Sequence, residues 1–405
     1  MVDTTLRIVH TSDWHVGHEL YCHGREAEHD AFLSWLIGTL KATRADMLLV
    51  TGDIYDVANP PTAAMARVYG FIRTALTECP HLTIAMIGGN HDSAARINLP
   101  GALLEAGRVH LIGQLPRCDG VIEMDRLLVP ARRSDGTVGA WVVAVPYCRP
   151  GDLGQGNLAD LYRNVIESAH ALADGLPLVV TGHLHLAGGD VSPNSERRIV
   201  VGGEEAEPSS LFDERVAYVA LGHLHRPQQV EGATLIRYAG SPIPMSMAER
   251  DYRHSITLVE IADGSVSASE IEVPRLARFE SLPRDGARPI AEVEAVLREY
   301  DPPMGGEPPF VEVCILMDSP EPGIAARVHA ALQEKAVRLA GIKSVLPDHA
   351  QRGAIAATVQ ELEEIDPVGV LRELHMRRHG AEPAADLTAA FERLLVEVAE
   401  AEAEA

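Results

Sequence analysis

Apolar and polar positions alternate in blocks along the first hundred residues. Short apolar runs at 6–13, 46–53 and 82–92 (LRIVHTSD, DMLLVTGD and LTIAMIGGNHD) read as buried strands. Between these runs, residues 25–44 and 62–79 carry apolar side chains at helical spacing. Strands that alternate with helices form a sheet covered by helices. We therefore predict an α/β fold with a layered β-sandwich core flanked by helices.

The same apolar blocks continue toward residue 274. They predict five more strands, AWVVAVPY, LPLVVTGHLH, AYVALGHLH, TLIRYAGS and HSITLVEI. Residues 275–350 are different: Pro-rich loops surround a strand FVEVCILM and helices near 290–300 and 323–339. We assign 1–274 to the core and expect a small, separate α+β domain after it.

Residues 355–405 predict two amphipathic helices. Asp366 is a good N-cap, Pro367 fits the first helical position, and Gly380 ends the first helix. The second helix has an apolar face made of Leu387, Phe391, Leu394, Leu395 and Val398. Such helices usually pack on their own domain, and the alternative is that they dock onto another chain.

The chain has 405 residues, which favours two or three domains, and a formal net charge of −23. An acidic surface repels phosphates, which argues against a generic DNA coat. The charge is uneven, however, because residues 355–405 hold 12 acids against 4 bases and so contribute −8. The total therefore says little about the sign of the charge near any one site.

Cysteine usage and the absence of targeting segments indicate a cytoplasmic protein. The five cysteines are scattered, odd in number and without CxxC spacing, so we expect free thiols in a reducing compartment. The N-terminus lacks the features of a secretory signal, and no run of about 18 apolar residues is present.

Polar side chains able to bind a metal follow five of the predicted strands. They are Asp13 and His15, then Asp53, then Asn90, His91 and Asp92, then His183, and finally His223 and His225. Ligands of open α/β sheets bind beyond the carboxyl ends of the strands, so these groups could converge. Asp13 and His15 are two residues apart and would point the same way in an extended chain. Four of the candidates follow a glycine, which allows close backbone approach or a sharp turn. These glycines are Gly52, Gly89, Gly182 and Gly222.

The types of ligand narrow the choice of metal. Imidazoles with carboxylates and an amide oxygen, without thiolate, suit Mn²⁺, Fe or Zn²⁺ better than Ca²⁺ or Mg²⁺ alone. Seven ligands are too many for one ion, and Asp53 is the natural bridge between two. Two ions about 3.5–4 Å apart lower the pKa of a bridging water and clamp both oxygens of an in-line displacement. The pattern therefore favours hydrolysis of phosphate esters.

Several assignments within this pattern have alternatives. GHLH at 182–185 lets either His183 or His185 be the ligand, and we prefer His183 because it directly follows Gly182. If Asn90 offers its amide oxygen to a metal, His91 is free to stabilise or protonate the leaving oxygen. Asp92 either orients His91 or caps the following helix. We interpret the other histidines near these segments as structural: His10, His18, His29, His81, His110 and His170.

The chain resembles the calcineurin-like metallophosphoesterase superfamily, whose pattern is D-x-H, G-D, G-N-H-D/E, H and G-H-x-H. The stretches HTSDWHVGHEL, LLVTGDIYD, IGGNHDS, VALGHLHRPQQV and IRYAGSPIPMSM more closely resemble the SbcD family, the nuclease subunits of bacterial SbcCD complexes. The resemblance covers most of the chain. It implies a Mn²⁺-dependent DNA exonuclease and endonuclease that processes DNA ends and hairpins in replication, recombination and repair.

The resemblance also implies roles for individual positions. One Mn²⁺ would be held by Asp13, His15, Asp53 and His225, and the other by Asp53, Asn90, His183 and His223, with His91 as the catalytic histidine. Residues 275–350 would form a capping domain, and 355–405 would bind the SMC-like ATPase SbcC. Family members form homodimers through helices of the early core. Asp56 stands where some relatives carry a histidine that touches phosphate.

Binding to DNA must be reconciled with the negative net charge of the whole chain. Local bases could contact phosphates, and the candidates are Arg132, Arg133, Arg149, Arg226 and Arg237. We expect that the isolated protein binds DNA weakly and that its affinity falls steeply with salt. The alternative functions are a small-molecule phosphodiesterase or phosphatase on the same core, and a non-catalytic scaffold that docks the ATPase.

Overall fold

The structure is a computed structural model. It describes residues 5–101, 107–154, 156–192, 206–303, 305–317 and 321–345, together with His375 and Leu387. Nearly all of these residues belong to one compact unit, made of Met1–Ile315 and Gly323–Lys343. The two helices predicted in 355–405 lie outside the described residues apart from those two positions.

Two six-stranded sheets form the core. The first has the order β16-β15-β1-β4-β5-β6. Its strands are β1 (Leu6–Thr11), β4 (Met47–Thr51), β5 (Thr83–Ile87), β6 (Val109–Ile112), β15 (Ser255–Ala262) and β16 (Ser265–Glu272). Strands β1, β4, β5 and β6 are parallel, and β15 and β16 are added antiparallel. The carboxyl ends of the parallel strands therefore share one edge.

The second sheet repeats this plan with the order β13-β14-β12-β11-β10-β9. Its strands are β9 (Leu128–Arg132), β10 (Val138–Val143), β11 (Leu178–His183), β12 (Tyr218–Gly222), β13 (Gln228–Val230) and β14 (Leu235–Tyr238). Strands β10, β11, β12 and β14 are parallel, and β9 and β13 are antiparallel at the two edges.

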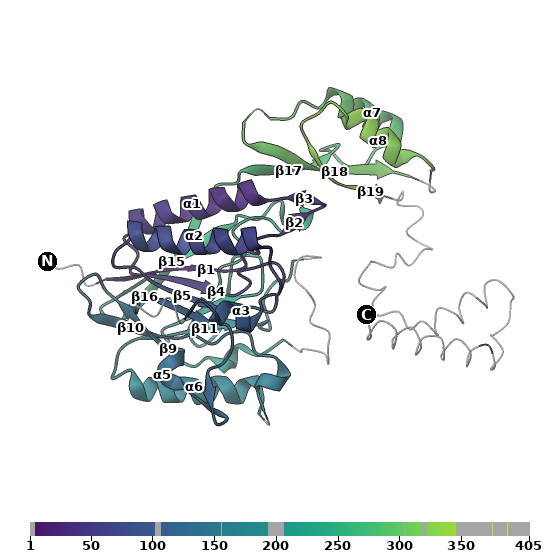
Figure 1. Cartoon of the computed structure of the whole chain (residues 1–405). Coiled ribbons are helices and arrows are strands. Elements are labelled where there is room, and N and C mark those ends of the chain that lie inside the picture. Colours follow the sequence, from purple (N-terminus) through teal and green to yellow (C-terminus); the bar gives the residue numbers. More distant parts are fainter. Residues whose placement is uncertain are drawn as a thin grey trace. The chain divides into compact units, whose positions relative to one another are not determined.

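Each central strand of the first sheet is buried on both faces. Ile8 and Leu49 pack in the layer between the two sheets with Val180. Val9 and Val50 point to the other side, into a cluster with the helices α1 (Glu26–Thr43) and α2 (Thr62–Glu78). Figure 1 shows these helices over the first sheet and α5 (Met124–Leu127) and α6 (Leu158–Leu172) over the second. Burial on both faces explains why the strands read as continuous apolar runs.

The predicted sandwich is confirmed, but the sequence interpretation missed both helices that cover the second sheet, α5 and the longer α6. Helix α6 begins after Asn157, whose side chain accepts a hydrogen bond from the backbone N–H of Asp160 at 2.8 Å. Its apolar face packs on the second sheet (Figure 1) through Leu161, Val165 and Ile166, which belong to the same buried cluster as Val179 and Val180. Strands β6, β9, β13 and β16 were also not predicted, and β16 is mostly exposed.

Residues 277–345 form a small α+β substructure. It contains β17 (Ala277–Leu282), α7 (Ile290–Glu299), β18 (Glu307–Leu316), α8 (Ile324–Leu332) and β19 (Arg338–Val345), and the strands have the order β17-β18-β19. The helix predicted over 323–339 is wrong at its end. Helix α8 stops at Leu332, because the following residues turn and add an edge strand to β18.

Short elements complete the described part of the chain. They are β2 (Glu19–Leu20) with β3 (His23–Gly24), α3 (Ala94–Asn98), β7 (Arg117–Cys118) with β8 (Val121–Ile122), and 3₁₀ turns at Pro150–Asp152, Ser209–Leu211 and Met247–Glu249. All five cysteines are free thiols, as predicted. Among the described residues, no helix has the length and hydropathy that crossing a bilayer would require.

Candidate metal centre

The predicted ligands lie at the carboxyl ends of strands from both sheets. Asp13 and His15 follow β1, and Asp53 follows β4. His183 is the last residue of β11 in the second sheet. Its Nδ1 lies 2.9 Å from the carbonyl oxygen of Thr51 at the end of β4, so the two sheets meet at this point. The convergence expected from the strand ends therefore occurs across the sandwich.

In the part of the chain that the structure describes, three overlapping groups of side chains could each hold a cation. In each group, one ligand atom per residue lies within 4.8 Å of the others. The groups are Asp13, His15 and His225, then Asp13, Asp53 and His183, and finally His15, Asp53 and His91. The two aspartates are each shared by two groups, which is the arrangement that a pair of neighbouring ions needs.

The remaining predicted ligands extend the part of the site around His183. The His183 Nε2 atom lies 2.9 Å from Asn90 Oδ1 and 3.3 Å from Asp53 Oδ2. The His223 ring lies 5.3 Å from the His183 ring, and the His225 ring lies 5.2 Å from that of His15. The two histidines of GHLH at 222–225 thus face different halves of the site.

Hydrogen bonds from the outer ring nitrogens orient three of these imidazoles. His183 Nδ1 donates to the Thr51 carbonyl, which leaves Nε2 directed at Asp53. His225 Nδ1 lies 3.0 Å from Glu249 Oε1, and His15 Nδ1 lies 3.4 Å from Asp56 Oδ1 (the second partner in each pair is a carboxylate). Metal-binding histidines typically have such a partner, because it fixes the tautomer and ring orientation.

The electrostatics of the site favour a buried positive charge. Burial alone would raise the pKa of the Asp53 carboxyl, but the His183 imidazolium holds it well below its usual range. Burial lowers the pKa of His183, and the Asp53 carboxylate more than reverses this and raises it to about 9. The His183 imidazole and the Asp53 carboxylate thus stabilise each other's charged forms. Burial also raises the pKa of Asp13, so this second carboxyl lacks sufficient positive charge nearby.

One unsatisfied atom supports the fit to a divalent metal. Within the described residues, His15 Nε2 is buried without a hydrogen-bond partner, and it lies 3.7 Å from Asp53 Oδ2. A buried polar atom left without a partner costs about 1–3 kcal/mol. Burial lowers the pKa of His223 to about 3, so this imidazole is neutral and can offer a lone pair. Imidazole nitrogens, carboxylates and an amide oxygen therefore suit divalent metal ions here.

The backbone at the site is strained. Asp13, His15, Asp53 and His223 have φ values of 52°, 45°, 47° and 99°. A non-glycine residue in this region costs of the order of 1–3 kcal/mol and persists only where its surroundings hold it. The expectation that Asp13 and His15 share a face because the chain is extended is therefore wrong. They face the site because Trp14, between them, is held in the opposite direction by Phe32 and Phe71.

The glycines that precede the ligands allow close approach, as predicted. A Cβ atom on Gly222 would overlap the Ser12 hydroxyl and the Thr51 carbonyl, both from the first sheet. A Cβ atom on Gly89 would overlap the backbone nitrogen and carboxylate of Asp53. Only glycine therefore lets the strand ends meet at these two positions.

His91 is fixed at the edge of the site. Its backbone N–H donates to Asp53 Oδ1 at 2.9 Å, and its Nδ1 donates to the carbonyl oxygen of Asp56 at 2.7 Å. The side chain is only half-buried, whereas Asp53 is 2% exposed. His91 therefore lies where the buried ligands give way to solvent, and Nε2 is the ring nitrogen that does not bind the Asp56 carbonyl.

Asp92 has a different role from either alternative expected. Its carboxylate accepts hydrogen bonds from the backbone N–H groups of Ile54, Tyr55 and Gly89 at 2.9–3.1 Å. The following helix is instead preceded by Ser93. Burial, with Asp53 nearby, raises the pKa of Asp92 to about 6. Asp92 therefore ties the loop after β4 to the loop after β5 and positions both.

Comparison with known proteins identifies the family. Residues 6–227 match the family described as Calcineurin-like phosphoesterase, and residues 275–378 match the Type 5 capsule protein repressor C-terminal domain. A Rhodobacter capsulatus protein, named as the SbcD component of the nuclease SbcCD, is 38% identical over 378 residues, which is 89% of this chain and 92% of the relative. The chain belongs to the calcineurin-like phosphoesterase family.

Other relatives carry the same name within this family. The Escherichia coli K12 protein is 31% identical and the alignment covers 82% of this chain and 84% of the relative. The Bacillus subtilis protein is 30% identical, with 64% of this chain and 67% of the relative covered. Because the similarity extends over most of the length of the first two relatives, this chain belongs with the SbcD proteins.

Two of the arginines expected near DNA are exposed, close to this phosphoesterase centre. Arg149 lies over the Tyr147 ring at 5.9 Å, and that ring lies 6.2 Å from His183. Arg226 follows His225, pairs with Asp190 at 2.8 Å, and is exposed. Both therefore remain candidates for contact with phosphate.

The structure corrects the remaining arginines. Arg237 is only 9% exposed and pairs with Glu270 at 2.5 Å, so its guanidinium is not available to DNA. Arg132 ends β9, and Arg133 lines a cavity of about 410 Å³ with Arg7 and Asp46. Arg7 and Asp46 stand at the amino ends of β1 and β4. Arg132 and Arg133 therefore lie at the end of the sandwich that is remote from the ligands.

Three groups near the centre were missed or misjudged from sequence. From the sequence, Asp56 was noted only because some relatives carry a histidine at this position, yet it contacts both His15 and His91. Glu249 lies just after the stretch IRYAGSPIPMSM, the only signal that could have found it. His18 was interpreted as structural, but its ring lies 6.4 Å from that of His15 and its buried Nδ1 lacks a hydrogen bond among the described residues.

The structural interpretation of two other histidines is confirmed. His10 is buried between the Tyr218 hydroxyl at 2.9 Å and the Thr51 hydroxyl at 3.0 Å. His29 contacts the carbonyl oxygens of Trp14 and Arg25, both at 3.0 Å. His185, the alternative ligand, is half-buried and is not part of any of the three cation-binding groups in the described chain.

Proposed function

We propose that this chain is the Mn²⁺-dependent nuclease component of a two-protein complex and hydrolyses phosphodiester bonds at DNA ends and hairpins. The observation that carries the proposal is the convergence of seven proposed ligands from five strand ends. His15 Nε2 is buried there without a hydrogen-bond partner in the described part of the chain. Membership of the phosphoesterase family and similarity to the SbcD proteins support the same chemistry.

The ligand sets follow the two halves of the site. Asp13, His15, Asp53 and His225 would hold one Mn²⁺, and Asp53, Asn90, His183 and His223 the other. The short distance from His183 Nε2 to both Asn90 and Asp53 supports the second set. When bound, two such ions would lower the pKa of a water nucleophile and offset negative charge on the phosphate.

His91 is the proposed catalytic histidine. Its Nδ1–H is committed to the Asp56 carbonyl, so Nε2 is the atom that can face substrate. A protonated Nε2 would stabilise the leaving oxygen or transfer a proton to it. Asp92 acts through the backbone that it binds, and we therefore revise its proposed role from catalysis to positioning.

Contacts to DNA would come from exposed cations beside the centre. Arg149 and Arg226 each lie against an aromatic ring, Tyr147 and Tyr252 respectively, which limits their motion. A restrained guanidinium loses less entropy on binding a phosphate oxygen. Because the chain is acidic overall, we expect this protein alone to bind DNA weakly, with steep dependence on salt.

The partners follow from the relatives and the tail. The name SbcCD of the relatives denotes a complex, and we propose that residues 355–405 dock an SbcC-like SMC-family ATPase. Residues 275–350 would act as the capping domain near DNA. The exposed free thiols of Cys22 and Cys118 are consistent with work in the cytoplasm.

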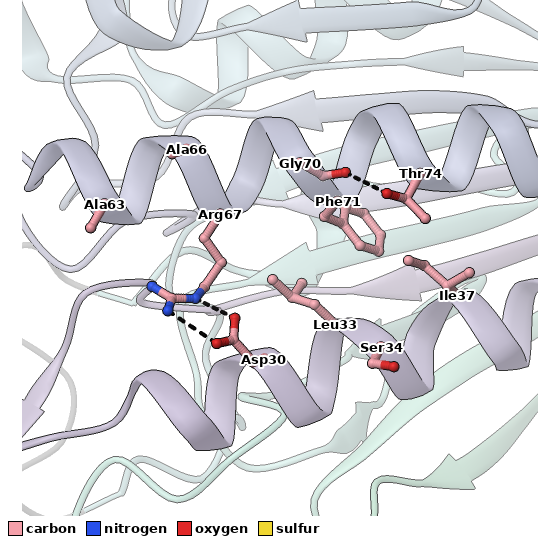
Figure 2. Close-up of a pocket in the computed structure, with 10 residues that line it drawn as sticks. All are labelled: Asp30, Leu33, Ser34, Ile37, Ala63, Ala66, Arg67, Gly70, Phe71 and Thr74. Atoms are coloured by element: carbon pink, nitrogen blue, oxygen red, sulfur yellow. Dashed lines mark hydrogen bonds and ion pairs between the residues drawn. The ribbon is translucent and has the colours of Figure 1, made fainter.

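We further propose that two copies of the chain pack through α1 and α2. A groove of about 450 Å³ lies between these helices. Figure 2 shows Leu33, Ile37 and Phe71 between the helices and the Arg67–Asp30 ion pair toward one end. Ala66 lines the groove and is exposed. Ala66→Arg should convert a dimer to a monomer in sedimentation analysis, and an unchanged sedimentation coefficient would contradict this surface.

Nuclease assays test the main proposal. Wild type, His91→Ala and His170→Ala are incubated with Mn²⁺ and linear duplex DNA, because His170 is an exposed histidine on α6. Wild type and His170→Ala should cleave, and His91→Ala should lose about 10²–10⁴-fold in rate. Hydrolysis of small phosphate esters without any cleavage of DNA would instead indicate a small-molecule phosphodiesterase, and inactivity on both would indicate a scaffold.

A truncation tests the partner assignment. Removal of residues 355–405 should abolish co-purification of the ATPase but leave Mn²⁺-dependent cleavage of single-stranded DNA. If the truncated chain still retains the ATPase, the docking site lies elsewhere.

A further inference from the structure

The segment 240–249, GSPIPMSMAE, connects β14 to the turn before β15 and contains none of the seven proposed ligands. Met245, Met247 and Glu249 are all buried, and Glu249 is 0% exposed. A fully buried carboxylate is costly unless strong hydrogen bonds compensate it. The contacts of Glu249 therefore indicate what this segment does.

The two oxygens of the Glu249 carboxylate have separate partners. Oε1 lies 3.0 Å from Nδ1 of His225. Oε2 accepts from the backbone N–H of Met245 at 2.8 Å and from the Ser241 hydroxyl at 3.4 Å. The carboxylate thus connects His225 to the backbone of the segment itself.

The other face of the segment contacts residues around the small α+β unit. The Pro244 carbonyl accepts a hydrogen bond from Arg25, whose guanidinium lies over the rings of Phe279 and Phe310. Met247 packs with the same two phenylalanines in one apolar cluster. The segment therefore lies between His225 on one side and β17 and β18 on the other.

Charged contacts reinforce this junction. Glu28 on α1 binds Arg25 at 2.6 Å and Arg338 of β19 at 3.3 Å, and the Arg338 guanidinium lies 3.9 Å from the centre of the Phe310 ring. Arg275 donates to the carbonyl oxygen of Arg250 at 2.6 Å, just beyond the segment. Apart from the exposed Arg275 contact, a continuous set of largely buried contacts thus runs from His225 to all three strands of the small unit.

We infer that Glu249 is a positioning residue for His225 and that segment 240–249 couples the metal centre to the capping domain. The inference rests on the proposed function, because it takes His225 as a metal ligand. Glu249 selects the tautomer with the proton on Nδ1, so that Nε2 presents its lone pair toward Asp13 and His15. Any shift of the capping domain that moves the segment then also turns the His225 ring.

Metal binding tests the positioning role. Wild type, Glu249→Gln and Glu272→Gln are titrated with Mn²⁺, and free Mn²⁺ is followed by electron paramagnetic resonance. Glu272 is a matched control because it is an exposed glutamate at the end of β16. Glu249→Gln should weaken one of the two sites by about 10–100-fold and leave the other unchanged. Wild-type affinity at both sites in this variant overturns the inference.

Hydrogen exchange tests the coupling in the unmodified protein, so it does not depend on how any variant folds. Mn²⁺ should slow amide exchange in 240–249 and in β18, as well as in the ligand loops, because coupled sites must influence each other reciprocally. Protection confined to the ligand loops overturns the coupling. If wild type binds no Mn²⁺, the proposed function fails together with this inference, whereas a normal wild type with an unaffected Glu249→Gln refutes this inference alone.

Discussion

His183 and His185 show how much a single residue position depends on its surroundings. Both follow the same strand within GHLH, and the preference for His183 came only from its place beside Gly182. In the structure, His183 ends β11 and is 1% exposed, with Asp53 and Asn90 within 3.3 Å of its Nε2. His185 is half-buried, and its pKa is lowered by burial.

The two neighbouring histidines provide a matched pair of variants. His183→Ala removes a proposed ligand and should reduce bound Mn²⁺ from two ions to one, while His185→Ala should still bind two. Elemental analysis after dialysis measures the stoichiometry directly. Loss of an ion from His185→Ala, with His183→Ala unaffected, would reverse the assignment.

Charged residues at this scale were predicted less well than the ligands. In the sequence, Arg237 and Arg149 were equally plausible as basic residues near DNA. In the structure, Arg237 is buried against Glu270, whereas Arg149 is exposed beside Tyr147. Asp92 sits in a recognisable motif, yet its bonds go to backbone N–H groups of two loops. The group that pairs with a charged side chain often comes from another segment of the chain, so a local sequence pattern does not predict the pair.

At the scale of elements, the strand ends combine strain with close approach. Asp13 and Asp53 have left-handed backbones, and Gly222 lies where any Cβ atom would overlap the facing sheet. The free energy that the sandwich core supplies maintains this geometry. The ligand loops are therefore rigid products of the two sheets and not independent motifs.

This close packing predicts opposite effects for two Gly→Ala substitutions. Gly222→Ala should destabilise the protein by more than about 2 kcal/mol, because the methyl group would push β12 away from Ser12 and Thr51. Gly38→Ala, in the middle of α1 with open space around it, should stabilise by about 0.5–1 kcal/mol. Urea unfolding measures both, and a Gly222→Ala variant as stable as wild type would contradict the packing argument.

Prediction of elements succeeded where apolar residues kept their helical spacing over many residues. The ranges 25–44 and 62–79 correspond to α1 and α2 within one residue at each end, because both helices bury one apolar face on the sheet. The end of α8 failed, because pairing of β19 into the small sheet replaced the helical continuation after Leu332. Tertiary pairing of this kind overrides local propensity.

At the scale of the whole molecule, bound metal should contribute to stability. Two buried carboxylates, Asp13 and Asp53, lie at the junction of the two sheets, where a divalent cation would balance their negative charge. An ion that binds only the folded state stabilises it by about 2.7 kcal/mol at a hundredfold excess over its dissociation constant.

Removal of metal should therefore lower the melting temperature. Thermal unfolding with Mn²⁺ and with a chelator should differ by several degrees in wild type, since about 1 kcal/mol shifts the midpoint by about 2–4 °C in larger domains. His91→Ala retains all the proposed ligands and should show the same difference, whereas Asp53→Asn should lose most of it. Equal melting curves for wild type in the two conditions would argue against a metal at the sheet junction.

The sequence by itself determined the layered α/β fold, the candidate ligands and the family resemblance, because all three depend on local signals. Apolar runs mark buried strands, and the ligands follow them directly. Only the tertiary structure decided that Arg237 is buried, that Asp92 binds backbone, and that Glu249 and Asp56 orient His225 and His15. The Arg237–Glu270 pair joins the two sheets, and the other contacts join loops that follow different strands. Contact between segments that are separate in sequence leaves no periodic trace in a single chain.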